Sequence, residues 1–258
     1  MRLKDKVAIV TGSASGLGKA MAKRFADEGA SIVVADINQE GIDTVVGELQ
    51  GMGGKAVGYK VDVSKKPEVK DFMKAIVDKF GRIDILVNNA GVNCLKPFLE
   101  MNEQDWDFVL GVDLKGVFFC SQAVAECMMK QRYGKILNIA SPQGDGGAPP
   151  GGDRTNYPYG SAKAGVIQLT KTLARELGPH GINVNCMAPS TVAMRMVSSN
   201  LTAQEAEAHV QMRRKGNVLG RLAAPVEIAN AALFLVSDES SFVAGQLLRV
   251  DGGRTDYM

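Results

Sequence analysis

Tyr159 and Lys163 lie four residues apart in the segment YGSAK, a spacing that can support proton transfer. Residues i and i+4 share one face of an α-helix, so a helix here would hold the lysine ammonium near the tyrosine hydroxyl. A free tyrosine has a pKa of about 10, and a neighbouring cation favours its phenolate form. The pair therefore predicts a general base for a substrate hydroxyl. Because this spacing also arises by chance, the prediction depends on where the pair lies in the fold.

A glycine-rich segment, TGSASGLG, joins the first apolar run of the chain to a helical stretch that is expected to begin near Leu17. Glycine lets a pyrophosphate approach the backbone, and the N-terminus of a following helix offers free N–H groups to it. The spacing differs from G-x-G-x-x-G, and an ordinary strand-to-helix turn could look the same. The residues predicted to hold a dinucleotide here are Gly12, Ser15, Gly16, Leu17 and Gly18.

Asp36 ends the second apolar run, 18 residues after Gly18. An acidic side chain at this place can accept hydrogen bonds from the adenosine ribose of a dinucleotide. It would repel a 2′-phosphate, and neither Ser15 nor Ile37 supplies a compensating cation. These residues predict NAD rather than NADP as the cofactor. The alternative is that Asp36 caps a helix that starts near Gln39.

Short apolar runs alternate with stretches of helical spacing along most of the chain. This alternation is typical of an α/β protein, and it predicts a Rossmann-type, doubly wound parallel sheet of about seven strands flanked by helices. Because no repeat or linker interrupts the series, we expect residues 1–258 to form one dinucleotide-binding domain. The predicted strands are 6–10, 31–35, 56–61, 83–87, 135–140, 182–188 and 246–250.

Two segments interrupt this alternation. Residues 142–158 are rich in glycine and proline, which predicts a loop without helix or strand. Residues 190–224 separate the sixth strand from a predicted last helix at 225–236 and are long for a simple connection, which predicts a lid. Both follow the carboxyl ends of strands, so we expect them to border one substrate site.

Composition narrows the possible partners. The chain has 30 basic and 28 acidic residues, and this near balance gives no attraction to nucleic acid or to an anionic membrane. The four cysteines lack the spacing of a zinc site, so no metal is expected. No apolar stretch at the N-terminus is long enough for a signal peptide or a membrane span. We expect a cytoplasmic protein that acts on a small molecule.

Further motifs give the chain a family resemblance. NNAG at 88–91, YGSAK at 159–163, the glycine-rich turn and the Asp62-Val63 pair together resemble the short-chain dehydrogenase/reductase family, over essentially the whole chain. The tail that begins at Gly220 is similar to those of 3-oxoacyl-carrier-protein reductases and of sugar or polyol dehydrogenases. The resemblance implies hydride transfer between a nicotinamide and a secondary alcohol or ketone, by an enzyme that is commonly a homotetramer.

The resemblance also implies individual roles. Ser141 would hydrogen-bond the reacting oxygen, Tyr159 would exchange its proton, and Lys163 would also hold the nicotinamide ribose. Read without the resemblance, Ser141 is a strand-terminal serine in a local turn. Asn93 and Gln143 are expected to line the substrate pocket. The further cofactor-binding residues that the resemblance implies are Asp62, Val63, Asn89, Ala90, Gly91, Tyr159 and Lys163.

Two positions depart from the family pattern. Asp113 stands where the family usually has asparagine, and its carboxylate could pair with Lys163 and still order water, or could hold the ammonium too tightly. We expect the first outcome and therefore include Asp113 among the catalytic residues. Five residues after Pro189, Met194 replaces a threonine that contacts the nicotinamide, and Thr191 is the candidate substitute.

Arginines in the two inserted segments suggest an anionic substrate. Arg154 lies in the predicted loop and Arg195 in the predicted lid. Guanidinium groups suit carboxylate, phosphate or sulfonate groups, although solvated surface charges would look the same.

The sequence thus predicts an NAD-dependent oxidoreductase that acts on a secondary alcohol or ketone. One alternative is a 3-oxoacyl thioester reductase that uses NADPH. Another is a non-catalytic subunit of a hetero-oligomer, which the unusual Asp113 and Met194 motivate.

Overall fold

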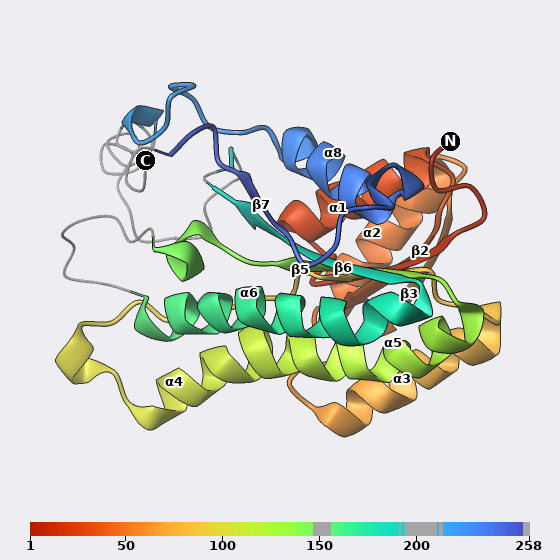
Figure 1. Ribbon diagram of the computed structural model, residues 1–258, viewed down its shortest axis with the longest axis horizontal. Coiled ribbons are helices and arrows are strands. Elements are labelled where there is room, and N and C mark those ends of the chain that lie inside the picture. Colours follow the sequence, from red (N-terminus) through yellow and green to blue (C-terminus); the bar gives the residue numbers. More distant parts are fainter. Residues whose placement is uncertain (147–155, 191, 194–210, 212–213, 255–258) are drawn as a thin grey trace.

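The core of the computed structural model is one seven-stranded sheet in which every neighbouring pair of strands is parallel (Figure 1). The strand order is β3-β2-β1-β4-β5-β6-β7, which confirms the predicted fold. The structure describes residues 1–146, 156–190, 192–193, 211 and 214–254. The strands are β1 (Val7–Thr11), β2 (Ser31–Asp36), β3 (Lys55–Lys60), β4 (Ile85–Asn88), β5 (Gly134–Ile139), β6 (Ile182–Pro189) and β7 (Leu247–Val250).

Helices cover both faces of the sheet because successive side chains of each strand point to opposite faces. In β1, Ala8 and Val10 pack into one apolar core, and Val7 and Ile9 pack into another. One core is covered by α1 (Gly16–Asp27), α2 (Gln39–Gly51) and α8 (Pro225–Val236). The helices on the other face are α3 (Lys66–Phe80), α4 (Glu103–Leu110), α5 (Val117–Gln131) and α6 (Tyr157–Leu177) (Figure 1).

The strand order reverses direction at β1, where the chain first adds β2 and β3 on one side and then adds β4 to β7 on the other. The connections that leave the carboxyl ends of β1 and β4 therefore diverge and leave a crevice between them. The glycine-rich turn follows β1 and the NNAG segment spans the end of β4, so both segments border this crevice. The fold thus brings together two motifs that are far apart in the sequence.

Helices α4 and α5 are joined without a break by a single π-helical stretch, η2 (Gly111–Gly116). Such wide turns are rare inside α-helices and are frequent at functional sites. The whole stretch 103–131 is long and apolar enough to cross a membrane by length and hydropathy alone. In this fold 44% of its most apolar window is buried within the protein, where α5 contributes Val124 and Met128 to the core.

The prediction that residues 142–158 form a loop is wrong at both ends. Pro142–Asp145 form a short 3₁₀ helix, η3, and α6 already begins at Tyr157. Both helices have proline in their first turn, where its missing N–H costs no hydrogen bond and its fixed φ suits a helix. The predicted last helix, 225–236, is confirmed.

Four buried polar side chains link the strands and helices that lie below the crevice. Asn88 Nδ2 donates to Asn138 Oδ1 (2.8 Å) and to Ser121 Oγ (3.1 Å). Asn138 Nδ2 donates to Thr170 Oγ1 (2.9 Å), which in turn donates to the Val166 carbonyl. Buried amides need such partners, so this network fixes β4 and β5 relative to α5 and α6.

We expect Asn138→Ala to lower the free energy of unfolding by about 1–3 kcal/mol, because it removes two buried hydrogen bonds, the one that Asn88 Nδ2 donates and the one that Thr170 Oγ1 accepts. Denaturant titration followed by circular dichroism would measure the change. Thr44→Ala, which removes an exposed hydroxyl bonded to the Glu40 carbonyl on α2, is the matched control, expected to change stability by at most about 0.5 kcal/mol. Equal stability of the Asn138 variant and the wild type would contradict the role given to this network.

Candidate active site

The turn after β1 has a backbone that only glycine can form easily. Gly12 and Gly16 have φ angles of 64° and 56°, in the left-handed region. A Cβ atom on Gly18 would lie 2.2 Å from the Gly12 carbonyl oxygen, so α1 packs directly against the turn. The turn therefore exposes backbone at the start of α1, as a pyrophosphate requires.

The NNAG segment holds this turn in place. Asn89 Nδ2 donates to the carbonyl oxygens of Thr11 (2.9 Å) and Gly12 (3.0 Å). In the reverse direction, Thr11 Oγ1 accepts from the backbone N–H groups of Asn89 and Ala90, both at 3.0 Å. Sequence reasoning missed Thr11, although its place at the end of β1 beside the glycines could have signalled a contact with the next strand. The two segments form one rigid border of the crevice.

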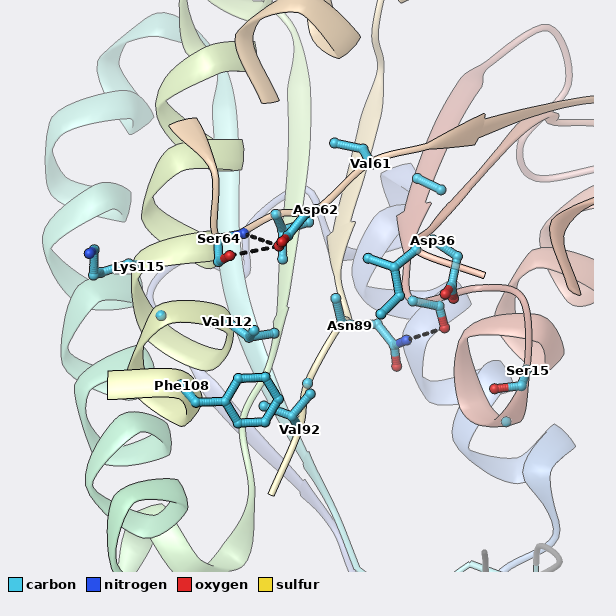
Figure 2. A pocket seen from close by; sticks show the side chains of 18 of the residues that line it. Ser15, Asp36, Val61, Asp62, Ser64, Asn89, Val92, Phe108, Val112 and Lys115 are labelled. Carbon is cyan, nitrogen blue, oxygen red and sulfur yellow. Dashed lines mark hydrogen bonds between the residues drawn. The ribbon is translucent and has the colours of Figure 1, made fainter. Parts of the chain in front are cut away.

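A cavity of about 620 Å³ opens between these segments and α4 (Figure 2). Ser15 and Asp36 lie on one side of it, Asp62 lies on the other, and Asn89 lies between them (Figure 2). Its size and its position at the carboxyl ends of β1 and β4 fit a dinucleotide. The predicted cofactor-binding residues that line it are Gly12, Ser15, Gly16, Leu17, Asp36, Ile37, Asp62, Val63, Asn89, Ala90 and Gly91.

One wall of this cavity comes from a helix that sequence reasoning did not include. Phe108, Val112 and Lys115 line the cavity from α4 and η2 (Figure 2). Their spacing of four and then three residues puts them on one helical face, which was the available signal. A mixed apolar and cationic wall suits a ligand that has both a flat ring and phosphate groups.

Asp36 faces the cavity and is held by backbone groups. Its Oδ2 accepts from Ala14 N–H (3.0 Å) and its Oδ1 accepts from Asn38 N–H (3.1 Å). The alternative that Asp36 caps α2 is wrong, because Asn38 is the cap and accepts from Gly41 N–H at 3.2 Å. Asp36 therefore places a fixed carboxylate at the cavity wall.

Tyr159 and Lys163 lie on α6, as their spacing predicted. The Lys163 ammonium nitrogen lies 5.3 Å from the centroid of the Tyr159 ring and donates to the Ile139 carbonyl oxygen at 2.9 Å. Only 2% of the Lys163 surface is exposed. The end of β5 and the first turns of α6 thus hold a buried cation beside the tyrosine.

Asp113 lies in the π-helical stretch and forms a buried ion pair with Lys163, with Oδ2 3.1 Å from the ammonium nitrogen. Its Oδ1 accepts from Val92 N–H at 2.7 Å. A Cβ atom on Gly91 would lie 2.9 Å from Oδ2, so the glycine of NNAG makes room for the carboxylate. Burial raises the pKa of Asp113, and this effect exceeds the lowering by Lys163 and by the Val92 N–H. The expected pairing of Asp113 with Lys163 is therefore present, and its effect on Tyr159 stays a prediction.

Ser141 caps the η3 helix, and its Oγ accepts from Gln143 N–H at 3.2 Å. Ser141 is therefore a strand-terminal serine whose side chain binds the backbone of a local turn, as one of the two interpretations predicted. This contact does not exclude a second role, because a hydroxyl that accepts a hydrogen bond keeps its own O–H as a donor. A Cβ atom on Gly144 would lie 2.5 Å from the backbone nitrogen of Ala164 and from the carbonyl carbon of Lys163, so this turn packs directly against the α6 backbone that carries Lys163.

The remaining predicted site residues do not line the cavity or lie outside the described residues. Asn93 is exposed and does not line the cavity, and Pro189 ends β6. Gly18 lies beneath the glycine-rich turn rather than at the cavity surface. The other predicted residues lie outside the described residues, so their roles stay predictions: Arg154, Thr191, Met194 and Arg195.

Comparison with known proteins agrees with this arrangement. A family model described as enoyl-(acyl carrier protein) reductase matches residues 12–255. The chain is 43% identical to the 3-oxoacyl-[acyl-carrier-protein] reductase FabG of Thermotoga maritima, covering 98% of this chain and 99% of that protein. It is 42% identical to the (2S)-[(R)-hydroxy(phenyl)methyl]succinyl-CoA dehydrogenase subunit BbsD of Thauera aromatica, covering 99% and 98%. The crystal structure of gox2181 has a TM-score of 0.90 and 30% identity, covering 97% of this chain and 96% of that one.

The parallel sheet, the glycine-rich turn at its switch point and the matches together define an oxidoreductase with a Rossmann-like fold. The chain belongs to the short-chain dehydrogenase/reductase family.

The raised pKa of Asp113 predicts how stability changes with pH. A carboxyl group whose pKa is higher in the folded state stabilises the fold fully below its unfolded pKa, and this stabilisation is lost as the pH rises through the folded pKa. Asn cannot titrate, so we expect the free energy of unfolding of the wild type to fall relative to that of Asp113→Asn as the pH rises above the ordinary value of 3.8. Denaturant titrations at several pH values toward neutrality would measure the difference, and parallel profiles would contradict the assignment.

Proposed function

We propose that this protein is an NAD-dependent oxidoreductase that transfers a hydride between the nicotinamide and a secondary alcohol or ketone. The observation that carries the proposal is the buried Asp113–Lys163 ion pair beside Tyr159, close to a cavity of dinucleotide size. The Lys163 ammonium is buried, and the Ile139 carbonyl and the Asp113 carboxylate hold it in place. Charged groups in such surroundings are common at sites of proton transfer. The cofactor supplies the hydride chemistry, and the protein supplies geometry and charge.

Each group of site residues has a separate role in binding the cofactor or in reacting with the substrate. The glycine-rich turn and Asn89–Gly91 would bind the pyrophosphate and the central part of the cofactor, and Asp36 would bind the adenosine ribose. Ser141 would donate its O–H to the reacting oxygen and orient it. Tyr159 would take the proton from the alcohol at its hydroxyl oxygen, or return it to the ketone.

Lys163 supports this proton exchange through its position. Its ammonium is held by the Ile139 carbonyl and by Asp113, so the positive charge stays beside the Tyr159 ring without side-chain rearrangement. A charge that is fixed before the reaction needs no reorganisation during it. The carboxylate of Asp113 offsets part of that charge, so Tyr159 is exposed to a weaker field than it would be beside a neutral asparagine.

Asp36 supports NAD over NADP. Both of its oxygens already accept backbone hydrogen bonds, so the carboxylate cannot turn away from a 2′-phosphate without losing them. Ile37, which is 63% exposed at the cavity wall, gives no cation. An NAD preference also distinguishes this proposal from an NADPH-dependent reductase.

A second candidate is a 3-oxoacyl thioester reductase, and the relatives favour it. The names of both relatives describe activity on an acyl group, which is carried by an acyl carrier protein in one case and by coenzyme A in the other. Acyl thioesters with a secondary alcohol or a ketone are therefore the substrate class to test beside simple alcohols and diols.

We expect Tyr159→Phe to lower turnover by about 100-fold or more, because it removes the hydroxyl that exchanges the substrate proton. NADH absorbance would follow oxidation of secondary alcohols and diols with NAD, and reduction of acetoacetyl-CoA with NADH or NADPH. Tyr59→Phe on β3, whose ring packs on Phe72, is the matched control and should keep wild-type turnover. Full activity of the Tyr159 variant would show that the mechanism is wrong, and a wild type that binds neither cofactor would favour a non-catalytic subunit.

We expect wild-type protein to bind NAD at least about tenfold more tightly than NADP, and the double variant Asp36→Ala, Ile37→Arg to reverse the preference. The variant removes the repelling carboxylate and adds a cation for the 2′-phosphate. Isothermal titration calorimetry with each cofactor gives both dissociation constants. Ile37→Ala alone should keep the NAD preference, and equal binding of both cofactors by the wild type would refute the role of Asp36.

A further inference from the structure

The turn that carries Ser141 is attached to the rest of the protein from two sides. On one side Gly144 packs on the α6 backbone at Lys163 and Ala164. On the other side Asp145, the last residue of η3, contacts Arg249 on β7. The first contact is close backbone packing, whereas the second is an ion pair between two side chains.

Two guanidinium nitrogens of Arg249 converge on one oxygen of Asp145. Nε donates to Oδ2 at 2.6 Å, and Nη2 contacts the same oxygen. The Asp145 side chain is 25% exposed and the Arg249 side chain is 49% exposed. An ion pair this open to solvent contributes little to overall stability. Its geometry still fixes the distance between the end of η3 and the strand.

Backbone hydrogen bonds connect β7 and the residues just after it to the two ends of the segment 190–224, which was predicted as a lid. Ser190 N–H donates to the Val250 carbonyl at 3.1 Å, where that segment begins. Just past β7, the carbonyls of Gly252 and Gly253 accept from the backbone N–H groups of Leu219 (3.1 Å) and Val218 (2.8 Å), near its end. Arg249 therefore lies on a strand that connects both ends of the segment 190–224 with the turn of Ser141.

We propose that Asp145 and Arg249 are positioning residues that hold the Ser141 turn against β7 and so keep the Ser141 hydroxyl in place for the substrate oxygen. This inference rests on the proposed function, because it takes Ser141 as the residue that orients the substrate. Inside the turn, Ser141 is held through its Oγ, which accepts from Gln143 N–H, and its carbonyl, which accepts from Gly144 N–H at 3.0 Å. Loss of the ion pair releases Asp145 from Arg249 and loosens these two hydrogen bonds within the turn.

The inference is tested with Arg249→Gln and Asp145→Asn, which remove the charge attraction and keep side chains of similar size. The first readout is hydrogen–deuterium exchange of the Gln143 and Gly144 amides, which needs no substrate. We expect faster exchange at these two amides in both variants and an unchanged melting temperature.

The second readout is the turnover of acetoacetyl-CoA with NADH. We expect kcat to fall about tenfold or more, because small misplacement of an orienting group is costly in rate, and KM for NADH to stay unchanged. The charge-reversed double variant, which combines Asp145→Arg with Arg249→Asp, should restore slower exchange and part of the lost kcat. Arg24→Gln, which breaks a comparable ion pair with Glu28 on α1 (2.8 Å), is the control and should change neither readout.

Unchanged exchange of the two amides in both single variants overturns the inference, and so does faster exchange with unchanged kcat. A loss of kcat that comes with a lower melting temperature and is not recovered in the charge-reversed variant also overturns it, because that result indicates general destabilisation. These outcomes are separate from failure of the proposed function, which the Tyr159→Phe comparison decides without reference to the ion pair.

Discussion

A lysine ammonium that is almost completely buried must be surrounded by groups that replace water, and much of the site follows from this requirement. Lys163 meets it with the Ile139 carbonyl and the Asp113 carboxylate. The carboxylate reaches this position because the helix widens at η2, and Gly91, with no Cβ, leaves space for it. The sheet, the π-helical stretch and the NNAG glycine therefore act as parts of one arrangement around a single positive charge.

The sequence was most informative where local chemistry and fold agree. The seven strands, the glycine-rich turn and the Tyr159–Lys163 pair were predicted because hydrophobic runs, glycines and i,i+4 spacing have direct structural meaning. The π-helical stretch at Asp113 was not predicted, since its wide turn is supported by tertiary contacts with the Val92 N–H and Lys163 rather than by residue type. The η3 helix was not predicted, because the glycines and prolines of this segment indicate a loop, whereas the single capping serine before them is a weaker signal for a helix.

Long-range pairs mark the limit of such reasoning. Thr11 bonds to Asn89 across 78 residues, and Asp145 bonds to Arg249 across 104. Neither pair has a periodic signal in the sequence. Thr11 and Asn89 meet because β1 and β4 are neighbours in the sheet, whereas Asp145 and Arg249 meet across β6, which lies between β5 and β7. Family membership narrows the chemistry to an oxidoreductase, while the choice of substrate depends on side chains around the cavity mouth.

The π-helical stretch has a consequence for how the long helix meets the sheet. Each α-helical residue advances by about 100°, so a turn that holds one extra residue rotates everything after it by roughly that angle. Cys120, Val124 and Met128 therefore face the core in a phase that α4, extended as a regular helix, would not give. If the turn between Gly111 and Gly116 closed to a regular α-helix with no residue removed, this apolar stripe would turn away from the strands, whereas deletion of one residue there would let a continuous α-helix keep the stripe against them. The wide turn of this short stretch thus sets the rotational alignment of the whole of α5, although none of its residues lies in that helix.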